Sequence, residues 1–355
     1  MAESRNIYEA YQREQEAQAR RLQQMELQRE RQAAEQSREQ ARIRREAELR
    51  VYYNSHIRPE LQRTERARRN LLIRVILSGV VITLLVSLLL FLKLSFLMVV
   101  LLPLGIGYMV YLAYRFERFR QRFKPAIVQL LLDFLNQQPN FQSLQYDAKR
   151  SIDKEVLKGS GLFFTRRALF EGEDHIEGQI GEMPFQLCEV YVKEESRASH
   201  RFETLFAGIF VHAHFNEKVI GKLAVWPTRK ANLMHRSLRA YYAQGGRPVK
   251  NTLKDNNFTE SFANHFTVYA HEGTIVQELL TPSMQQAMVK YANVLGERDV
   301  YFAINNQELF AAISHEYDLL EPSFFQTNVS FELIRTFYDD IESVLEVVQA
   351  FDQTR

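Results

Sequence analysis

The chain has 355 residues, with 45 lysine and arginine residues against 43 aspartate and glutamate residues, so its formal net charge at pH 7 is +2. This near balance gives no overall argument for a nucleic-acid partner, and none is expected. The lone cysteine, Cys188, excludes an internal disulfide and a multi-cysteine metal site and is typical of a reducing compartment. The strongly polar start has no signal-peptide pattern, so the first apolar span is expected to act as both targeting signal and anchor.

Residues 1–50 are rich in Glu, Gln, Arg and Ala and contain no Gly, Pro or Lys, a composition that favours helix. The best heptad frame places apolar residues such as Leu22 and polar residues such as Arg29 on the same seam, whereas a coiled coil needs a nearly unbroken apolar seam. We expect residues 1–58 to form a polar helix or weak coiled coil. This segment is either a polar spacer or an interaction site. In the second case, residues 1–50 bind a protein partner or a second copy of the chain. Pro59 is expected to interrupt this helix.

The longest apolar segment is 71–114, about twice the length of one membrane-spanning helix. It predicts two transmembrane helices, Leu72–Leu92 and Leu94–Tyr114, joined by a tight turn at Lys93–Ser95. Lys93 is the single charge between Val75 and Tyr114 and marks the turn that reaches the far headgroups. The alternative, a buried hairpin of a soluble domain, would need a core that covers the segment on every side.

Basic residues flank both predicted spans, and we call these two groups the basic collars. They are Arg58, Arg63, Arg66, Arg68 and Arg69 before the first span, and Arg115, Arg118, Arg120, Arg122 and Lys124 after the second. The positive-inside rule then predicts a two-span protein of the cytoplasmic (inner) membrane with both termini in the cytoplasm. Membrane lipid is the expected partner of the hairpin and of the collars.

Segment 115–142 is predicted as a juxtamembrane region, with a short new helix starting at Lys124–Pro125. Segment 143–355 is predicted as a cytosolic α+β domain, an antiparallel sheet covered by helices. The expected strands are His175–Ile180, Phe185–Lys193, Leu205–Phe215 in a hairpin with Val219–Trp226, Phe262–Tyr269 in a pair with Thr274–Leu280, and Val300–Ile304 in a hairpin with Gln307–Ile313. The expected helices run from Thr281–Pro282 to Gly296 and over Leu333–Phe351, and Thr228–Phe258 is expected to be a long excursion.

Two clusters carry side chains suited to chemistry. His212 and His214 alternate on one strand, so both face the same way and have a spacing that can ligate a metal. The acidic run 171–174 contains Glu173 and Asp174, which suit cation binding or acid–base work, and is otherwise a solvated turn between strands. The simpler interpretation of the two histidines is that they lie on the surface or line a barrel. The simpler interpretation of the acidic run is the solvated turn, so no metal and no cofactor is predicted. Ser151 and Lys154 match Ser-x-x-Lys without its companion boxes, which indicates a chance match.

Several segments in the same order resemble a family of bacterial membrane proteins catalogued as a domain of unknown function, some of whose members carry a "galanin" label. The segments are Lys158–Phe163, Gly172–Gly181, Phe185–Val190, Phe206–Phe210, His214–Asn216, Val225–Pro227, Phe262–Tyr269 and Leu280–Pro282. The resemblance covers roughly residues 70–350 and implies two transmembrane helices followed by a cytosolic α+β domain. It implies no activity.

The leading hypothesis is a membrane-anchored cytosolic binding or scaffold module of unknown ligand, because no catalytic constellation accompanies the well-patterned sheet. The alternative is a membrane-bound hydrolase, metal-dependent or not, that uses the Glu173/Asp174 and His212/His214 region. The two hypotheses differ in one geometric requirement. A hydrolase needs the histidines and a carboxylate to converge in one pocket.

Overall fold

The computed structural model describes residue 36 and residues 40–163, 168–195, 201–215, 220–231, 258–296, 298–315 and 324–353. The chain divides into two units, Met1–His56 and Ile57–Arg355. The predicted heptad seam of residues 1–50 lies mostly outside the described residues. In the first unit, residues 40–52 are helical. Apart from the turn that joins the two units, the features that follow belong to the second unit.

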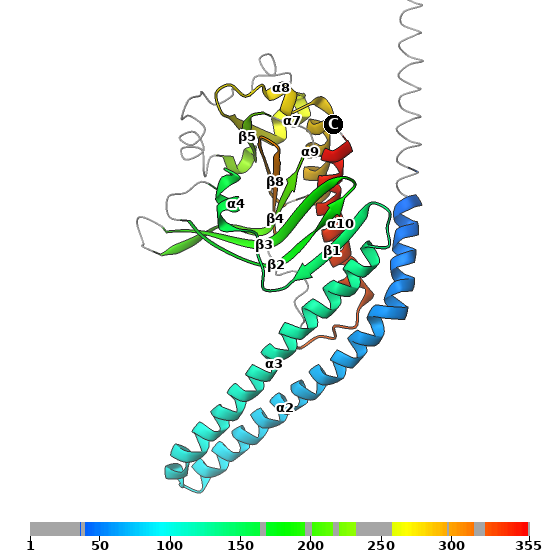
Figure 1. Ribbon diagram of the computed structural model, residues 1–355. Helices are drawn as coiled ribbons and strands as arrows, with labels where there is room; N and C mark the ends of the chain where they lie inside the picture. The colour runs from blue at the N-terminus through cyan, green and yellow to red at the C-terminus, as the bar shows by residue number, and fades with distance from the viewer. Residues whose placement is uncertain are drawn as a thin grey trace, which may run out of the picture. The chain divides into compact units, whose positions relative to one another are not determined.

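Two long helices form the apolar hairpin (Figure 1). They are α2 (Arg58–Phe91) and α3 (Met98–Leu135), joined by a turn at Lys93 and the 3-10 helix η2 (Ser95–Leu97). Lys93 has a φ of 53°, which lets the chain reverse within a few residues. The helices approach closely at Gly105, where an added Cβ would meet the Ile82 side chain at 3.2 Å. The predicted turn is confirmed.

Pro59 and Pro125 were predicted to interrupt helices, and both predictions are wrong. Pro59 lies in the first turn of α2, where the missing N–H has no partner to lose, and the π-helical turn η1 (Tyr53–Ile57) precedes it. Pro125 lies inside α3, so no new helix begins at Lys124. An interior proline costs about 3 kcal/mol. Burial of the following apolar side chains offsets this, at about 1.5–3 kcal/mol each; they are Ile127, Val128, Leu131, Leu132 and Leu135.

The sheet has eight strands in the order β1-β2-β3-β4-β8-β7-β5-β6. Every neighbouring pair is antiparallel. The strands are β1 (Phe141–Asp147), β2 (Ala168–Ile180), β3 (Met183–Glu195), β4 (Phe202–His214), β5 (Lys222–Pro227), β6 (Phe266–Ala270), β7 (Val300–Asn305) and β8 (Glu308–Ser314). Helices of this domain within the described residues include α4 (Lys154–Gly159), α7 (Glu260–His265), α8 (Val276–Leu279), α9 (Pro282–Leu295) and α10 (Phe331–Gln353). The α+β fold is therefore confirmed.

In the central strands, consecutive residues are apolar, so both faces of the sheet carry apolar side chains. Both faces are accordingly covered by other parts of the chain. On one face α10 and the second half of α3 pack over β1 to β4, and we call this the anchor face (Figure 1). On the other face α4 and the loop after it cover an aromatic core, and we call this the core face. This core includes Leu157, Phe163, Cys188, Phe206, Phe210, Trp226, Tyr301 and Phe310.

The predicted hairpin between the strand ending near Phe215 and the strand ending at Trp226 is wrong. Strand β4 pairs with β8, and β5 pairs with β7 and β6. Alternation of apolar residues identifies a strand but leaves its partner open, and here the β7–β8 hairpin lies between the two predicted partners. Gly208 permits the pairing of β4 with β8, since a Cβ there would lie 2.1 Å from the Ile313 carbonyl oxygen. The turn residues 216–218 lie outside the described part of the chain.

The strand pair predicted around Gly273 is also wrong in part. Residues 260–265 form helix α7, because the Thr259 hydroxyl accepts the Phe262 N–H and caps the first turn. Only Phe266–Ala270 is a strand, and it pairs with β5. The segment predicted as its partner contains the short helix α8.

The last two helices and the hairpin between them are confirmed. Thr281 caps α9 by accepting the Met284 N–H, and Gly296 ends it with a φ of 64°. Strands β7 and β8 form a hairpin in which Asn305 pairs with Glu308, so its turn lies one residue later than predicted. The predicted last helix buries an apolar stripe with a spacing of three to four residues, namely Ile334, Phe337, Tyr338, Ile341, Leu345 and Val348.

Candidate functional site

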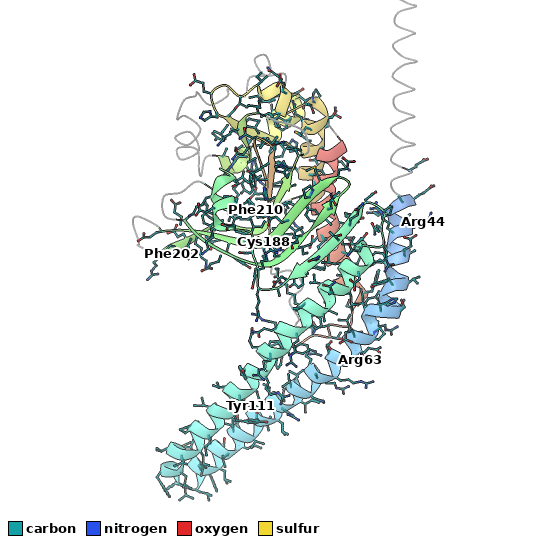
Figure 2. The ribbon with its side chains drawn as sticks, viewed as in Figure 1. Arg44, Arg63, Tyr111, Cys188, Phe202 and Phe210 are labelled. Atoms are coloured by element: carbon teal, nitrogen blue, oxygen red, sulfur yellow. The ribbon has the colours of Figure 1, made fainter. Side chains whose placement is uncertain are left out.

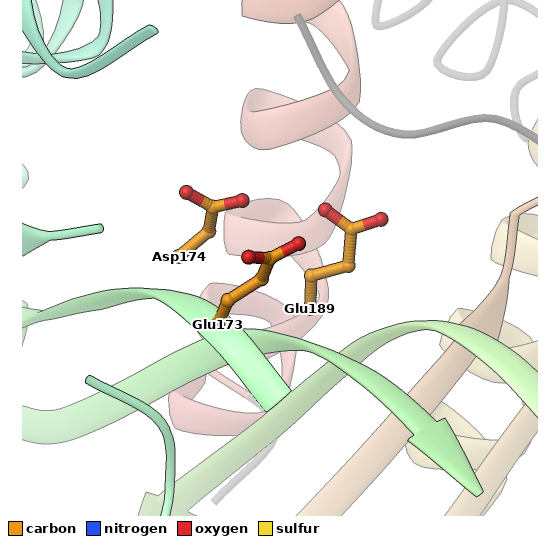
Figure 3. Close-up of side chains that lie close together, drawn as sticks. All are labelled: Glu173, Asp174 and Glu189. Carbon is orange, nitrogen blue, oxygen red and sulfur yellow. The ribbon is translucent and has the colours of Figure 1, made fainter. Parts of the chain in front are cut away.

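A β-bulge in β2 brings Glu173 and Asp174 to the same face of the sheet. Neighbouring residues in a regular strand point to opposite faces. Here Glu173 pairs with Glu189, the pairing shifts by one residue before Ile176, and Asp174 has a φ of 58°. Ligand oxygens of Glu173, Asp174 and Glu189 all lie within 4.8 Å of one another (Figure 3). The acidic run is therefore part of a strand, and its interpretation as a solvated turn is wrong.

Helix α3 places a lysine against these carboxylates. Lys124 Nζ lies 2.5 Å from Asp174 Oδ2 and 3.6 Å from Glu189 Oε2. Lys124 and Glu189 are buried, and Asp174 is partly buried. The Tyr146 hydroxyl donates a hydrogen bond to Asp174, and the Tyr191 hydroxyl donates one to Glu189 at 3.0 Å. Burial and the Asp174 carboxylate raise the pKa of Tyr146 above its ordinary value of 10.0. The hydroxyl therefore remains a proton donor at physiological pH.

A small cavity borders this cluster. Its volume is about 20 Å³, and it lies between α3, strands β1 to β4 and α10. Lys124, Asp174 and Tyr146 line its polar side, and Phe337 and Ile341 line its apolar side. That volume accommodates roughly one water molecule. Pockets for organic ligands measure about 300–1,000 Å³, so this cavity does not hold an organic substrate.

The carboxylates supply an oxygen-only donor set, which is the type that Ca²⁺ and Mg²⁺ prefer. However, the Lys124 ammonium already stands as the cation against Asp174 and Glu189. A lysine buried between two carboxylates is typical of a structural ion cluster. The cluster fits the role of a tie between α3 and the sheet.

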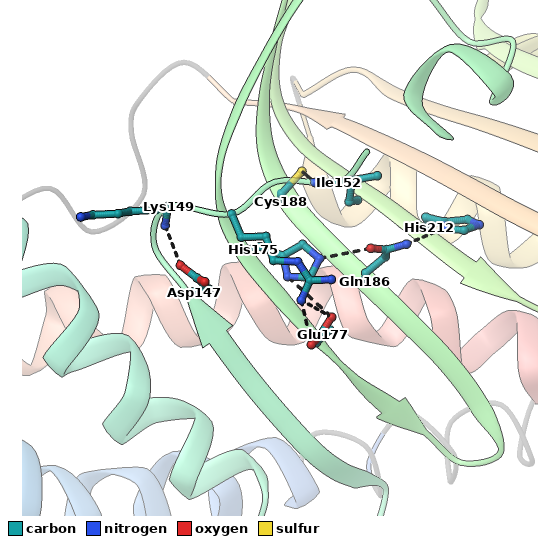
Figure 4. Close-up of polar contacts among 9 residues, drawn as sticks. Asp147, Lys149, Ile152, His175, Glu177, Gln186, Cys188 and His212 are labelled. Atoms are coloured by element: carbon teal, nitrogen blue, oxygen red, sulfur yellow. Dashed lines mark hydrogen bonds and ion pairs between the residues drawn. The ribbon is translucent and has the colours of Figure 1, made fainter. Parts of the chain in front are cut away.

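The two predicted histidines lie on the other side of the sheet. In β3, Gln186 and Glu189 are three residues apart and so face opposite ways. Gln186 donates a hydrogen bond to His212 Nδ1 at 2.9 Å and also contacts His175 Nε2 at 3.1 Å (Figure 4). The ring of His212 stacks on Phe310 at 4.8 Å. His212 is thus a packed side chain of the core face.

His214 does not join a metal site with His212. His214 is exposed at the end of β4, and His212 Nε2 lies 3.5 Å from Glu308. Burial lowers the pKa of His212 below 6.5, against the opposing effect of Glu308. Within the described part of the chain, no group of three metal-binding side chains includes a histidine. The Glu173/Asp174 and His212/His214 pairs are not brought together, so the geometry offers no support for the hydrolase alternative.

The lone cysteine and the Ser-x-x-Lys segment have structural roles. Cys188 is buried in the core face, and burial raises its thiol pKa to about 12, which makes it a poor nucleophile. Within the Ser-x-x-Lys match, Asp153 caps α4 by accepting the Glu155 N–H at 2.8 Å.

Sequence reasoning missed Lys124, Tyr146 and Glu189 as a unit. The sequence pattern places Lys124 among the other basic residues of the second collar. A signal was nevertheless present, since Lys124 stands directly before the apolar run that the sheet buries.

Comparisons with known proteins agree with a domain of undefined activity. Residues 204–353 match the model of a family described as "Protein of unknown function (DUF3137)". No curated protein matches the chain. One solved structure, that of the mycobacterial trehalose monomycolate transport factor A, TtfA, aligns with 56% of this chain and 88% of its own at 9% identity. Its TM-score of 0.25 is too low to carry an argument about fold or function.

Proposed function

We propose that the protein is a membrane-anchored binding or scaffold module, whose hairpin holds the sheet domain at the cytoplasmic surface of a bacterial inner membrane. The observation that carries this proposal is helix α3. Its first half is apolar and exposed, while its second half is buried against the sheet. One helix of 38 residues is about 57 Å long and exceeds the 30 Å bilayer core, so it can serve as both span and domain element.

The exposure of the hairpin supports lipid as its surroundings. Helices α2 and α3 are long and apolar enough to cross a membrane, and only 6% of the most apolar window of each is buried. A core helix of a soluble protein would be mostly covered. Exposed side chains on the hairpin include Ile76, Leu84, Leu90, Phe91, Val99, Leu104 and Val110. Such a surface is stable in lipid and would aggregate in water.

The arrangement in the membrane follows from charge. The basic collars, against Lys93 alone at the turn, favour both termini in the cytoplasm. We also propose the division into a polar helix or weak coiled coil (1–58), a hairpin (71–114), a juxtamembrane segment (115–142) and a cytosolic domain (143–355). Residues 1–50 remain a proposed site for a protein partner or a second copy. The resemblance to the two-span bacterial family supports the same layout.

Topology is testable with single cysteines, because the native Cys188 is buried and gives little background. Lys93→Cys should react with a membrane-impermeant maleimide added to intact cells. Thr336→Cys, on the exposed side of α10, should react only after the membrane is opened. Labelling of Thr336→Cys in intact cells would refute the proposed orientation, and recovery of the protein in the soluble fraction would refute the proposed anchoring.

A further inference from the structure

A basic groove lies between α2 and α3, directly after the end of the second proposed span at Tyr114. It has a volume of about 560 Å³. Its α2 side is formed by Arg63, Thr64, Ala67 and Leu71. Its α3 side is formed by residues between Tyr111 and Phe123. Figure 2 labels Arg63 on α2 and Tyr111 on α3, and both line the groove. A space of this size fits a small polar group with part of an attached apolar chain.

The arginines of α3 are aligned along this groove. Arg115, Arg118 and Arg122 follow a spacing of three and four residues, which places them on one side of the helix. Arg120, which does not line the groove, pairs instead with Glu117. The positive-inside rule requires positive charge near the span but sets no preferred side of the helix. The alignment therefore needs its own explanation.

On the α2 side, Arg63 pairs with Glu60 at 3.2 Å, whereas the aligned arginines of α3 have no carboxylate partner within the described part of the chain. Arg115 donates a hydrogen bond to the Tyr111 hydroxyl at 3.2 Å, and Arg118 lies over the Tyr114 ring at 4.6 Å. Neither these two arginines nor Arg122 forms an ion pair with a described carboxylate. Guanidinium groups match the geometry of phosphate oxygens and bind them with charge-assisted hydrogen bonds. These exposed and aligned guanidinium groups are therefore suited to bind an anion.

We propose that this groove binds the phosphate headgroup of an anionic phospholipid. The proposal rests on the membrane anchoring proposed above. The floor of the groove contains the buried side chains Leu71 and Phe123, and the exposed side chains Leu104 and Tyr108, two helical turns before Tyr111 and Arg115, continue the same side of α3 toward the bilayer. A lipid can place its headgroup on the arginines and its acyl chains on this surface. A free phosphate ion could use only the arginines.

The test compares two variants of the full chain that lose equal charge. Arg115→Gln, Arg118→Gln and Arg122→Gln together alter the groove, whereas Arg66→Gln, Arg69→Gln and Arg120→Gln together alter exposed arginines outside it. Each protein is placed in nanodiscs of phosphatidylglycerol and phosphatidylcholine, and co-purified lipid is counted by native mass spectrometry after mild detergent release. The native protein should retain phosphatidylglycerol selectively. The groove variant should lose this retention by on the order of tenfold or more, and the control variant should keep it.

Several results would overturn the site. Equal loss in both variants would show diffuse attraction to the surface, and equal retention of the two lipids by the native protein would show no headgroup preference. Displacement of the lipid by millimolar inorganic phosphate would show a site for the free anion. Membrane fractionation of all three proteins separates this inference from the anchoring proposal. Native protein that stays in the membrane without selecting phosphatidylglycerol refutes the groove alone, whereas its loss from the membrane refutes both.

Discussion

At the scale of single residues, the anchor face depends on one buried cation. Lys124 lies between Asp174 and Glu189. The two carboxylates carry one more formal charge than the single ammonium group neutralises. Removing the lysine would leave two carboxylates close together in a poorly solvated place. Loss of one partner from a buried ion pair costs about 3–5 kcal/mol, a large part of a domain stability of about 5–15 kcal/mol.

Lys124→Met keeps most of the side-chain length and removes the charge. We expect it to lower the free energy of unfolding by about 3–5 kcal/mol, because Asp174 and Glu189 lose their counter-ion. The lone Trp226 is buried in the core face, so its fluorescence during urea unfolding in detergent can report the change.

Lys158→Met is the matched control, because Lys158 is 52% exposed and its ion pair with Glu155 spans one turn of the same helix. Its effect should be about 0.5 kcal/mol or less. Adding Asp174→Asn to Lys124→Met should restore part of the lost stability. Equal unfolding midpoints for the two lysine variants would contradict the structural role of Lys124.

At the scale of elements, α10 closes the anchor face. Its buried stripe packs over the sheet, and Asp340 on the same helix pairs with Arg298 at 2.7 Å and lies 3.5 Å from His315. These contacts join α10 to residues flanking β7 and β8. Because Ile341 also borders the cavity beside Asp174 and Glu189, a charge at this position would meet two carboxylates.

Ile341→Asp should therefore destabilise the domain by several kcal/mol, or force the new carboxyl to take up a proton. The expected readouts are faster limited proteolysis and an earlier Trp226 unfolding transition. Thr336→Asp introduces the same residue on the exposed side of α10 and should leave both readouts nearly unchanged. Normal protease resistance of Ile341→Asp would mean that α10 does not pack there in solution.

At the scale of the whole molecule, insertion and orientation depend on different parts of the proposed hairpin. Apolar residues in the two spans supply the favourable transfer into lipid, at about 0.3–0.6 kcal/mol for each Leu, Ile, Phe or Val. On the proposed topology, the collars contribute little to insertion and are expected to set the orientation through their excess over Lys93. Arg68 differs from the other collar residues, since it is buried and hydrogen-bonded to Glu65 and to the Phe324 carbonyl.

Reversing the charge asymmetry should therefore invert part of the population. The variant carries glutamine at six collar positions and two added lysines beside Lys93; the positions are Arg66, Arg69, Arg115, Arg118, Arg120 and Arg122. Arg68 is retained because its loss would also disturb packing. We expect the protein to stay in the membrane fraction while a substantial share of its domains becomes accessible to protease from outside. Complete protection would show that folding of the domain before insertion sets the topology.

The sequence by itself determined the features that depend on neighbours along the chain. The two apolar helices, the turn at Lys93, the Thr281 cap and the buried stripe of α10 all followed from composition, capping residues or a 3.6-residue period. Each of these signals acts over a few residues, so it survives without knowledge of the fold.

Only the tertiary structure decided which distant residues meet. It placed β8 beside β4, kept α3 continuous through Pro125, and turned residues 260–265 into helix. It also moved Asp174 to the face of Glu173 through a bulge and brought Lys124 to both carboxylates, while His212 went to the opposite face. Strand partners and buried ion pairs depend on long-range packing, and a local pattern does not carry that information.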